Sequence, residues 1–159
     1  MRGEVKRVVK SKGGRAVREI LFRGKRIENG EWVRGDLVHV ENKSYISYYY
    51  ESPLSTFINE QIKYDDISIV GVAPFIEVDI ATIGQYTGLN DKTGKKIFEG
   101  DIISCGYLCD FFVEYSEEDA EYWANFGDSI GSLHTYFDPK RATVIGNIYD
   151  NPELLEVKE

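Results

Sequence analysis

The chain has 159 residues, of which 42% are hydrophobic and 13% aromatic, and a formal net charge of −8. This composition supports a folded core and excludes a globally disordered chain. No apolar run approaches the roughly 18 residues of a membrane span. The basic N-terminus is not followed by the apolar stretch of a secretory signal. We therefore expect a soluble cytoplasmic protein with no membrane partner.

Charge is segregated along the sequence. Residues 1–26 carry ten Lys or Arg against two Glu, giving +8, and the remainder carries 9 basic against 25 acidic residues, giving −16. Gly13 and Gly14 interrupt any helix, so we interpret residues 1–17 as a basic arm ahead of a folded body, residues 18–159. The arm can fold back, dock on the acidic body of a second copy, contact a polyanion, or remain a solvated tail. The candidate polyanion contacts are Lys6, Arg7, Lys10, Lys12 and Arg15.

The body is predicted to be β structure punctuated by turns. Asn29-Gly30 between apolar segments is a strong hairpin signal, because such turns need positive φ. Strand segments are rich in β-branched and aromatic residues. The predicted strands, in chain order, lie at 18–22, 32–33, 37–40, 45–50 and 67–72.

A spaced glycine pattern occurs twice. Gly24, Gly30 and Gly35-Asp36 correspond to Gly88, Gly94 and Gly100-Asp101. In each copy the second glycine is expected to make a hairpin turn, and the Gly-Asp pair a sharp bend whose Asp bonds to nearby amides. The pattern predicts two similar halves, about 18–78 and 79–156, which together build a small β-barrel or roll.

Two helical segments are predicted. Ser116 and Asp119 resemble a helix N-terminus, with Glu117 and Glu118 at the positive end of the dipole and Gly127 as the stop. An acidic helix is therefore expected up to Phe126, with an aromatic face that is either core or an exposed partner surface. Asn151-Pro152 predicts a short C-terminal turn over 152–156.

Three segments carry a family resemblance: residues 19–35 (EILFRGKRIENGEWVRG), 83–101 (IGQYTGLNDKTGKKIFEGD) and 144–155 (VIGNIYDNPELL). In these motifs the chain resembles the YopX-like proteins of bacteriophages and prophages. The resemblance covers about residues 18–156 and leaves the basic arm outside. It implies an origin in a bacterial cytoplasm, a mostly-β fold with SH3-like barrel or roll elements, and a homo-oligomer, but no biochemical activity.

The residues do not point to catalysis. His39 and His134 are the two histidines, and neither stands in a nucleophile–base motif; Walker-type and Gly-x-Ser-x-Gly loops are absent. Cys105 and Cys109, four apart in a predicted strand, fit two buried reduced thiols, with a metal site completed by the two histidines as the alternative. We expect no enzyme activity, no cofactor and no metal.

Aromatic side chains mark the expected partner surface, because Tyr and Trp are the typical anchors of interfaces. We expect a protein-interaction module that self-associates or binds a phage or host protein. The alternative is a nucleic-acid accessory protein that uses the basic arm, although the acidic body repels a polyanion. The candidate surface residues are Tyr48, Tyr49, Tyr50, Tyr122 and Trp123.

Overall fold

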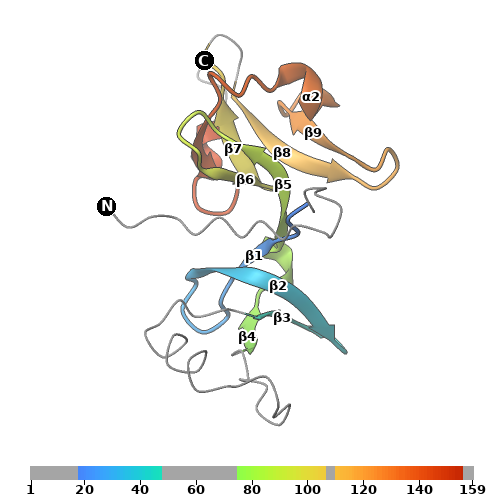
Figure 1. The fold of residues 1–159 in the computed structure, drawn as a ribbon. Helices are drawn as coiled ribbons and strands as arrows, with labels where there is room; N and C mark the ends of the chain where they lie inside the picture. The colour runs from blue at the N-terminus through green and yellow to red at the C-terminus, as the bar shows by residue number, and fades with distance from the viewer. Residues whose placement is uncertain (1–17, 48–74, 107–109, 156–159) are drawn as a thin grey trace, which may run out of the picture.

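The computed structural model describes residues 18–47, 75–106 and 110–155. They form two antiparallel sheets, so the predicted mostly-β class is confirmed (Figure 1). In spatial order, the first sheet contains β4 (Phe75–Val78), β3 (Lys43–Ser47), β2 (Trp32–Val40), β1 (Phe22–Lys25), β5 (Gly84–Asn90) and β6 (Lys96–Phe98). The second contains β10 (Ile130–Ser132), β9 (Glu121–Asn125), β8 (Phe111–Ser116), β7 (Asp101–Ser104) and β11 (Thr143–Asn147).

The first sheet curls back on itself without closing. β1 and β2 are joined by the predicted turn, in which Gly30 has φ +72°. At the opposite edge, β4 returns to the end of β1: Val78 forms a bridge with Arg26, and Asp79 N donates to Lys25 O at 2.8 Å. Within the described ranges both sheets stay open, so the SH3-like element does not take the form of a closed barrel.

The two Gly-Asp pairs behave differently. Gly35 does not bend the chain as predicted but lies within β2, where an added Cβ would sit 1.9 Å from Ser47 O of β3. Its role is to let two strand backbones approach closely. Gly100 has φ +81° and does form a turn, between β6 and β7, and Asp101 Oδ2 accepts from Phe98 N at 2.8 Å as expected. Both repeat units thus form a hairpin, and they diverge at the Gly-Asp pair.

The predicted acidic helix is wrong. Residues 111–125 form the β8–β9 hairpin, with Tyr115 paired to Tyr122. Ser116 and Asp119 do bond to each other, because Ser116 Oγ accepts from Asp119 N at 3.2 Å and donates to its carboxylate at 2.9 Å, but this contact closes a turn. Ala120 ends the turn in the left-handed region, at φ +54°.

Two hydrophobic clusters form the core. The smaller lies under the first sheet and centres on Val33, Ile46 and Val78. The larger lies under the second sheet and includes Phe111, which is fully buried. Ile97 belongs to the larger cluster although its strand, β6, hydrogen-bonds within the first sheet. The β5–β6 hairpin therefore connects the two parts of the molecule, and β5 runs between them in Figure 1.

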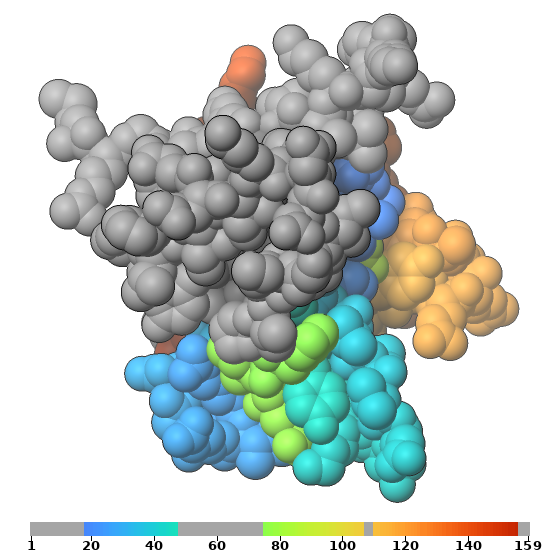
Figure 2. All heavy atoms as spheres, turned by 60° about the horizontal axis from the view of Figure 1, so that its bottom comes forward, coloured from blue at the N-terminus to red at the C-terminus, as the bar shows by residue number. Residues whose placement is uncertain are grey.

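Helical structure is limited to short pieces. These are η1 (Ile80–Thr82), the single described α-helix α2 (Leu133–Tyr136) and η2 (Pro152–Leu155), where the predicted C-terminal turn is confirmed. None of the helices in the described ranges has the length and apolar character needed to cross a membrane. Figure 2 shows β2, β3 and β4 on one face, with the β8–β9 hairpin projecting at its side.

Candidate functional site

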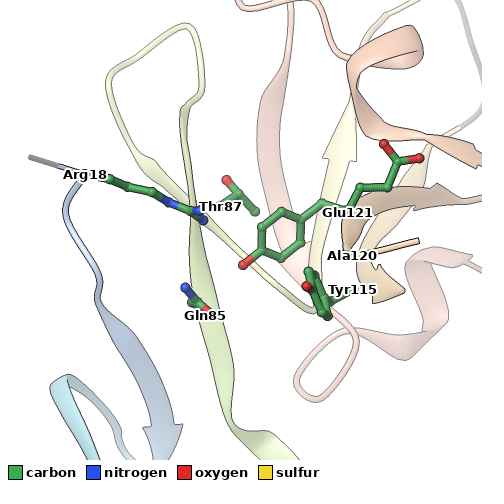
Figure 3. Close-up of a pocket in the computed structure, with 7 residues that line it drawn as sticks. Arg18, Gln85, Thr87, Tyr115, Ala120 and Glu121 are labelled. Carbon is green, nitrogen blue, oxygen red and sulfur yellow. The ribbon is translucent and has the colours of Figure 1, made fainter. Parts of the chain in front are cut away.

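A groove opens where the two sheets meet, between β5 and the β8–β9 hairpin (Figure 3). Its volume is about 340 Å³. Residues far apart in sequence form it, because β5 belongs to the first sheet and the hairpin to the second. We call it the tyrosine groove; it is lined by Arg18, Gln85, Thr87, Tyr115, Ala120, Glu121 and Tyr122.

A tyrosine pair forms the wall on the hairpin side. The rings of Tyr115 and Tyr122 meet edge to face, with centroids 5.2 Å apart. Tyr122 packs against the larger cluster, whereas Tyr115 is 40% exposed. Burial raises the pKa of Tyr122, and the nearby Glu99 carboxylate raises it further, so the hydroxyl stays protonated at neutral pH. The pair therefore presents ring surface together with a neutral hydroxyl that can donate or accept.

Arg18 lies across the groove from the tyrosine pair, on the segment that leads into β1 (Figure 3). Its guanidinium donates a hydrogen bond to the Tyr122 hydroxyl and thereby lowers the pKa of Tyr122, against the effect of burial. Gln85 and Thr87 stand two apart on β5 and so share the face that lines the groove. No described residue hydrogen-bonds to the Gln85 side-chain amide, which leaves that amide free for a ligand.

The described lining of the groove consists mostly of rings and polar side chains, and its one threonine hydroxyl is already hydrogen-bonded. Thr87 is its one simple alcohol, and its hydroxyl donates to Ile97 O at 2.9 Å while accepting from Leu89 N at 3.1 Å. Both contacts are internal, so this hydroxyl is already committed to the β5–β6 hairpin. The Glu121 carboxylate is also committed, because it accepts from Trp123 Nε1 at 3.1 Å and from the Ser132 hydroxyl at 3.3 Å. What remains for a ligand is ring surface, a guanidinium and an amide.

The structure separates the aromatic residues predicted as one partner surface. Tyr122 lies in the tyrosine groove. Trp123 is its neighbour on a strand rather than on a helix, so its side chain points to the opposite face, where Nε1 donates to Glu121 Oε1 at 3.1 Å. Tyr48, Tyr49 and Tyr50 lie outside the described residues.

Of the seven lining residues only Tyr122 was predicted from sequence, and three of the six that were missed supply ring or polar contacts to the groove: Arg18, Gln85 and Tyr115. A signal existed for Tyr115, because it faces Tyr122 across the β8–β9 turn and a hairpin interpretation of that segment pairs them directly. Arg18 and Gln85 reach the groove only through the pairing of β1 with β5, and no local pattern reports that contact.

The remaining predicted sites are not assembled by the structure. The candidate polyanion contacts all fall in residues 1–17, which lie outside the described ranges. Cys109 also lies outside the described ranges. Cys105 is 4% exposed, its Sγ donates to Tyr136 O at 3.6 Å, and burial raises the pKa of its thiol. His39 Nδ1 and Ser44 Oγ lie 2.9 Å apart on paired strands. Among the residues that can be described, no three His, Cys, Asp or Glu side chains are grouped to hold a metal ion.

The fold and the groove together define a small two-sheet β protein with a surface groove at the junction of the sheets. The chain belongs to the YopX protein family, whose model matches residues 21–156, and the resemblance seen in the sequence is confirmed. Its fold is similar to the crystal structure of protein EF1440 from Enterococcus faecalis, with a TM-score of 0.51 and 23% identity over 87% of this chain and 99% of that one. No curated protein matches the chain.

Proposed function

We propose that this protein is a non-enzymatic phage or prophage accessory protein of the bacterial cytoplasm, acting as a protein-interaction module that self-associates. The observation that carries the proposal is the tyrosine groove, in which a half-exposed tyrosine pair, a guanidinium and an amide without a hydrogen bond to any described residue converge at the junction of two sheets. Tyrosine and arginine are the residue types most enriched where interfaces gain their energy. The curl of the first sheet supports the SH3-like roll as the scaffold of this module.

The occupant that fits best is a second copy of the chain. Arg18, at one end of the groove, continues directly into the basic arm, and residues 1–26 carry +8 against −16 for the remainder. An arm of one copy and the acidic body of another are therefore complementary in charge. Apolar side chains are also exposed away from the groove, for example Phe75 at 56% and Ile80 at 66%. Substitutions there serve as controls for substitutions in the groove.

The mass of the full chain in solution tests the proposal. We expect multi-angle light scattering after size exclusion to report a dimer or larger assembly. Tyr115→Ser combined with Arg18→Glu should weaken assembly by about tenfold or more, the effect of losing an interface anchor. Phe75→Ser is the matched control, an exposed aromatic on β4 away from the groove, and should leave the mass unchanged. A wild-type chain that stays monomeric at the highest soluble concentration would refute self-association.

The alternative, a nucleic-acid accessory protein, rests on the charge of the arm. Fluorescence anisotropy with single-stranded and duplex DNA, at low and moderate salt, separates the two. Contacts to phosphates make affinity fall steeply as salt rises. The alternative is favoured if the DNA affinity of the full chain falls steeply with salt and is lost when five residues of the arm are changed to Gln: Lys6, Arg7, Lys10, Lys12 and Arg15. Absence of DNA binding at low salt would refute the alternative.

A further inference from the structure

A second pocket lies on the other side of β1, where β2 and the β5–β6 turn meet β11. Its volume is about 340 Å³, at the lower end of the range of small-molecule sites. It is lined by charged and aromatic side chains from both sheets, notably Arg23, Trp32, Arg34, Lys95, Asp101 and Asp150. We call it the arginine pocket. It shares no lining residue with the tyrosine groove.

The carboxylates of the arginine pocket are already neutralised. Asp101 pairs with Arg23 at 2.5 Å, and Asp150 pairs with Lys25. Asp150 Oδ2 also accepts from Trp32 Nε1 at 2.6 Å. Burial alone would raise the pKa of Asp150, but hydrogen bonds from Asn147, Lys25 and Trp32 lower it to about 2. The carboxylate is therefore ionised and fully engaged at neutral pH.

Two cations of the pocket lack such a partner. Over the described ranges, neither Arg34 nor Lys95 has a carboxylate oxygen within 4.0 Å, and both side chains are exposed. Arg34 is held by stacking instead, with its guanidinium 5.2 Å from the centre of the Phe98 ring. Partial burial and the positive charge of Arg23 lower the pKa of Arg34, while Asp101 acts in the opposite direction. Arg34 and Lys95 are thus two accessible cations that line one pocket, inside a chain of net charge −8.

Hydrogen bonds hold the floor of the pocket, and close packing holds its far wall. Arg23 is 7% exposed and held by two hydrogen bonds, to Asp101 and to Glu99 O. The far wall is β11, where the register shifts by a bulge between Val144 and Gly146. An added Cβ at Gly146 would lie 2.6 Å from Asn151 Oδ1, so the close packing of this wall requires glycine. Bulges of this kind often shape binding sites. A preformed wall lowers the entropic cost of binding a ligand.

We propose that the arginine pocket binds a phosphate group, with Arg34 and Lys95 as the residues that hold it. Guanidinium presents a planar fork of N–H donors that matches two oxyanion oxygens, and ammonium adds a point charge. Two uncompensated positive charges match a phosphate monoester, which carries about −1.5 to −2 at pH 7, better than a carboxylate, which carries a single charge. The ligand is free phosphate or the terminal phosphate of a small ester.

Trp32 supplies a built-in reporter, because its ring lines the pocket and has the guanidinium of Arg23 at 4.7 Å. In full-length protein carrying Trp123→Phe, fluorescence reports Trp32 alone. Inorganic phosphate, methyl phosphate and acetate are titrated at constant ionic strength. We expect saturable binding of phosphate with an affinity about tenfold or more higher than that of acetate, because phosphate carries more negative charge for the hydrogen bonds of the two cations. Tighter binding of methyl phosphate than of phosphate assigns the site to an ester; the reverse assigns it to the free ion.

Single substitutions test whether Arg34 and Lys95 hold the phosphate. Arg34→Gln and Lys95→Gln should each weaken phosphate binding by about tenfold. Lys92→Gln is the matched control, a lysine of the same turn that does not line the pocket, and should bind as the parent does. Phosphate should also raise the melting temperature of the parent and of Lys92→Gln, but not of the two pocket variants.

Several outcomes would overturn the proposal: no saturation by phosphate, equal affinity for acetate, or equal loss in Lys92→Gln. Tyr115→Ser with Arg18→Glu should leave phosphate binding intact, so failure of this site and failure of self-association are observed separately.

Discussion

Arg23 and Asp101 form a buried ion pair between β1 of the first sheet and β7 of the second. Their side chains are 8% and 2% exposed, and Arg23 Nη1 lies 2.5 Å from Asp101 Oδ1. Burial raises the pKa of Asp101, while the charge of Arg23 and a hydrogen bond from Phe98 N lower it. Forming such a pair costs desolvation energy, but removing one partner leaves a buried charge without compensation.

We therefore expect Asp101→Asn to lower the free energy of unfolding by about 3 kcal/mol or more. Urea unfolding followed by circular dichroism measures the change. Glu77→Gln is the matched control, since Glu77 pairs with Lys43 at 2.9 Å but the side chains are 36% and 57% exposed. Breaking that surface pair should leave the free energy of unfolding close to the wild-type value, because exposed pairs contribute little. Similar losses in the two variants would contradict a structural role for the buried pair.

Asp91 ties the β5–β6 turn to β11. Its Oδ1 accepts from the Thr93 hydroxyl at 2.7 Å and from Thr93 N and Lys95 N at 2.8 and 3.0 Å, and its Oδ2 accepts from Val144 N at 3.1 Å. The residue is 5% exposed. Burial alone would raise the pKa of Asp91, but the hydrogen bonds lower it from 3.8 to about 2.

This shift predicts a specific acid dependence. Because the folded-state pKa lies below the unfolded value, ionised Asp91 stabilises the fold above about pH 4, and that contribution is lost as the pH falls toward 2. Its full size is about 2 kcal/mol. We expect Asp91→Asn to be less stable at neutral pH and to show a flatter loss of stability between these pH values. Asp128→Asn, on an exposed loop, should keep the wild-type slope; an unchanged slope in Asp91→Asn would contradict the assignment.

The sequence predicted one half of the Arg23–Asp101 contact. The Gly-Asp pattern predicted that Asp101 bonds to a nearby amide, and Phe98 N is that donor. Its partner Arg23 is 78 positions away, and no periodicity connects the two. The same limit explains the tyrosine groove, where Tyr122 was predicted but Arg18 was not. Local patterns identify residues that satisfy their own turn, whereas contacts between sheets depend on strand order.

The β8–β9 hairpin shows how a local signal can fit two structures. A serine followed three residues later by an acid satisfies a helix N-terminus, and here the same pair closes a hairpin turn. Strand periodicity decides the outcome, because Phe111 and Val113 are buried two apart on β8 and Ala124 is buried opposite Val113 on β9. The long-range partner, β7, then holds the hairpin in the second sheet.

Two positions at the ends of β9 test this hairpin with opposite signs. Ala120 has φ +54°, a conformation that costs a non-glycine residue about 1 kcal/mol. Ala120→Gly should therefore raise the free energy of unfolding by up to about 1 kcal/mol. Gly127 has φ +90° with open space around its Cβ position, so Gly127→Ala should destabilise by about the same amount through the backbone alone. Thermal unfolding of both variants measures the two changes in the free energy of unfolding. If both variants are stabilised or both are destabilised, the turn has a different backbone conformation.

At the scale of the molecule, the β5–β6 hairpin belongs to the hydrogen bonding of one sheet and to the hydrophobic cluster of the other. It hydrogen-bonds to β1 in the first sheet, yet Ile97 is buried in the cluster under the second. The Arg23–Asp101 pair adds a polar connection across the same junction. The repeated glycine pattern suggested two similar halves, but strand order divides the chain differently, because β5 and β6 follow β4 in sequence and still complete the first sheet.

This connection predicts that both sheets unfold in one transition. The chain offers one tryptophan in each sheet, Trp32 on β2 and Trp123 on β9. In Trp123→Phe, fluorescence follows the first sheet, and in Trp32→Phe it follows the second, while circular dichroism follows all strands in both. Cooperative coupling requires that, within each variant, the fluorescence and circular dichroism midpoints in urea coincide.

Ile97→Ala provides the decisive comparison, because it removes side-chain packing from the second cluster while leaving the backbone bonds of β6 in place. A fully buried isoleucine truncated to alanine costs about 2–5 kcal/mol. If the sheets are coupled, the Trp32 signal, which comes from the first sheet, must move to lower urea by as much as the circular dichroism signal. If the Trp32 midpoint stays in place while circular dichroism shifts, the first sheet is stable by itself and the hairpin is a linker rather than a shared element.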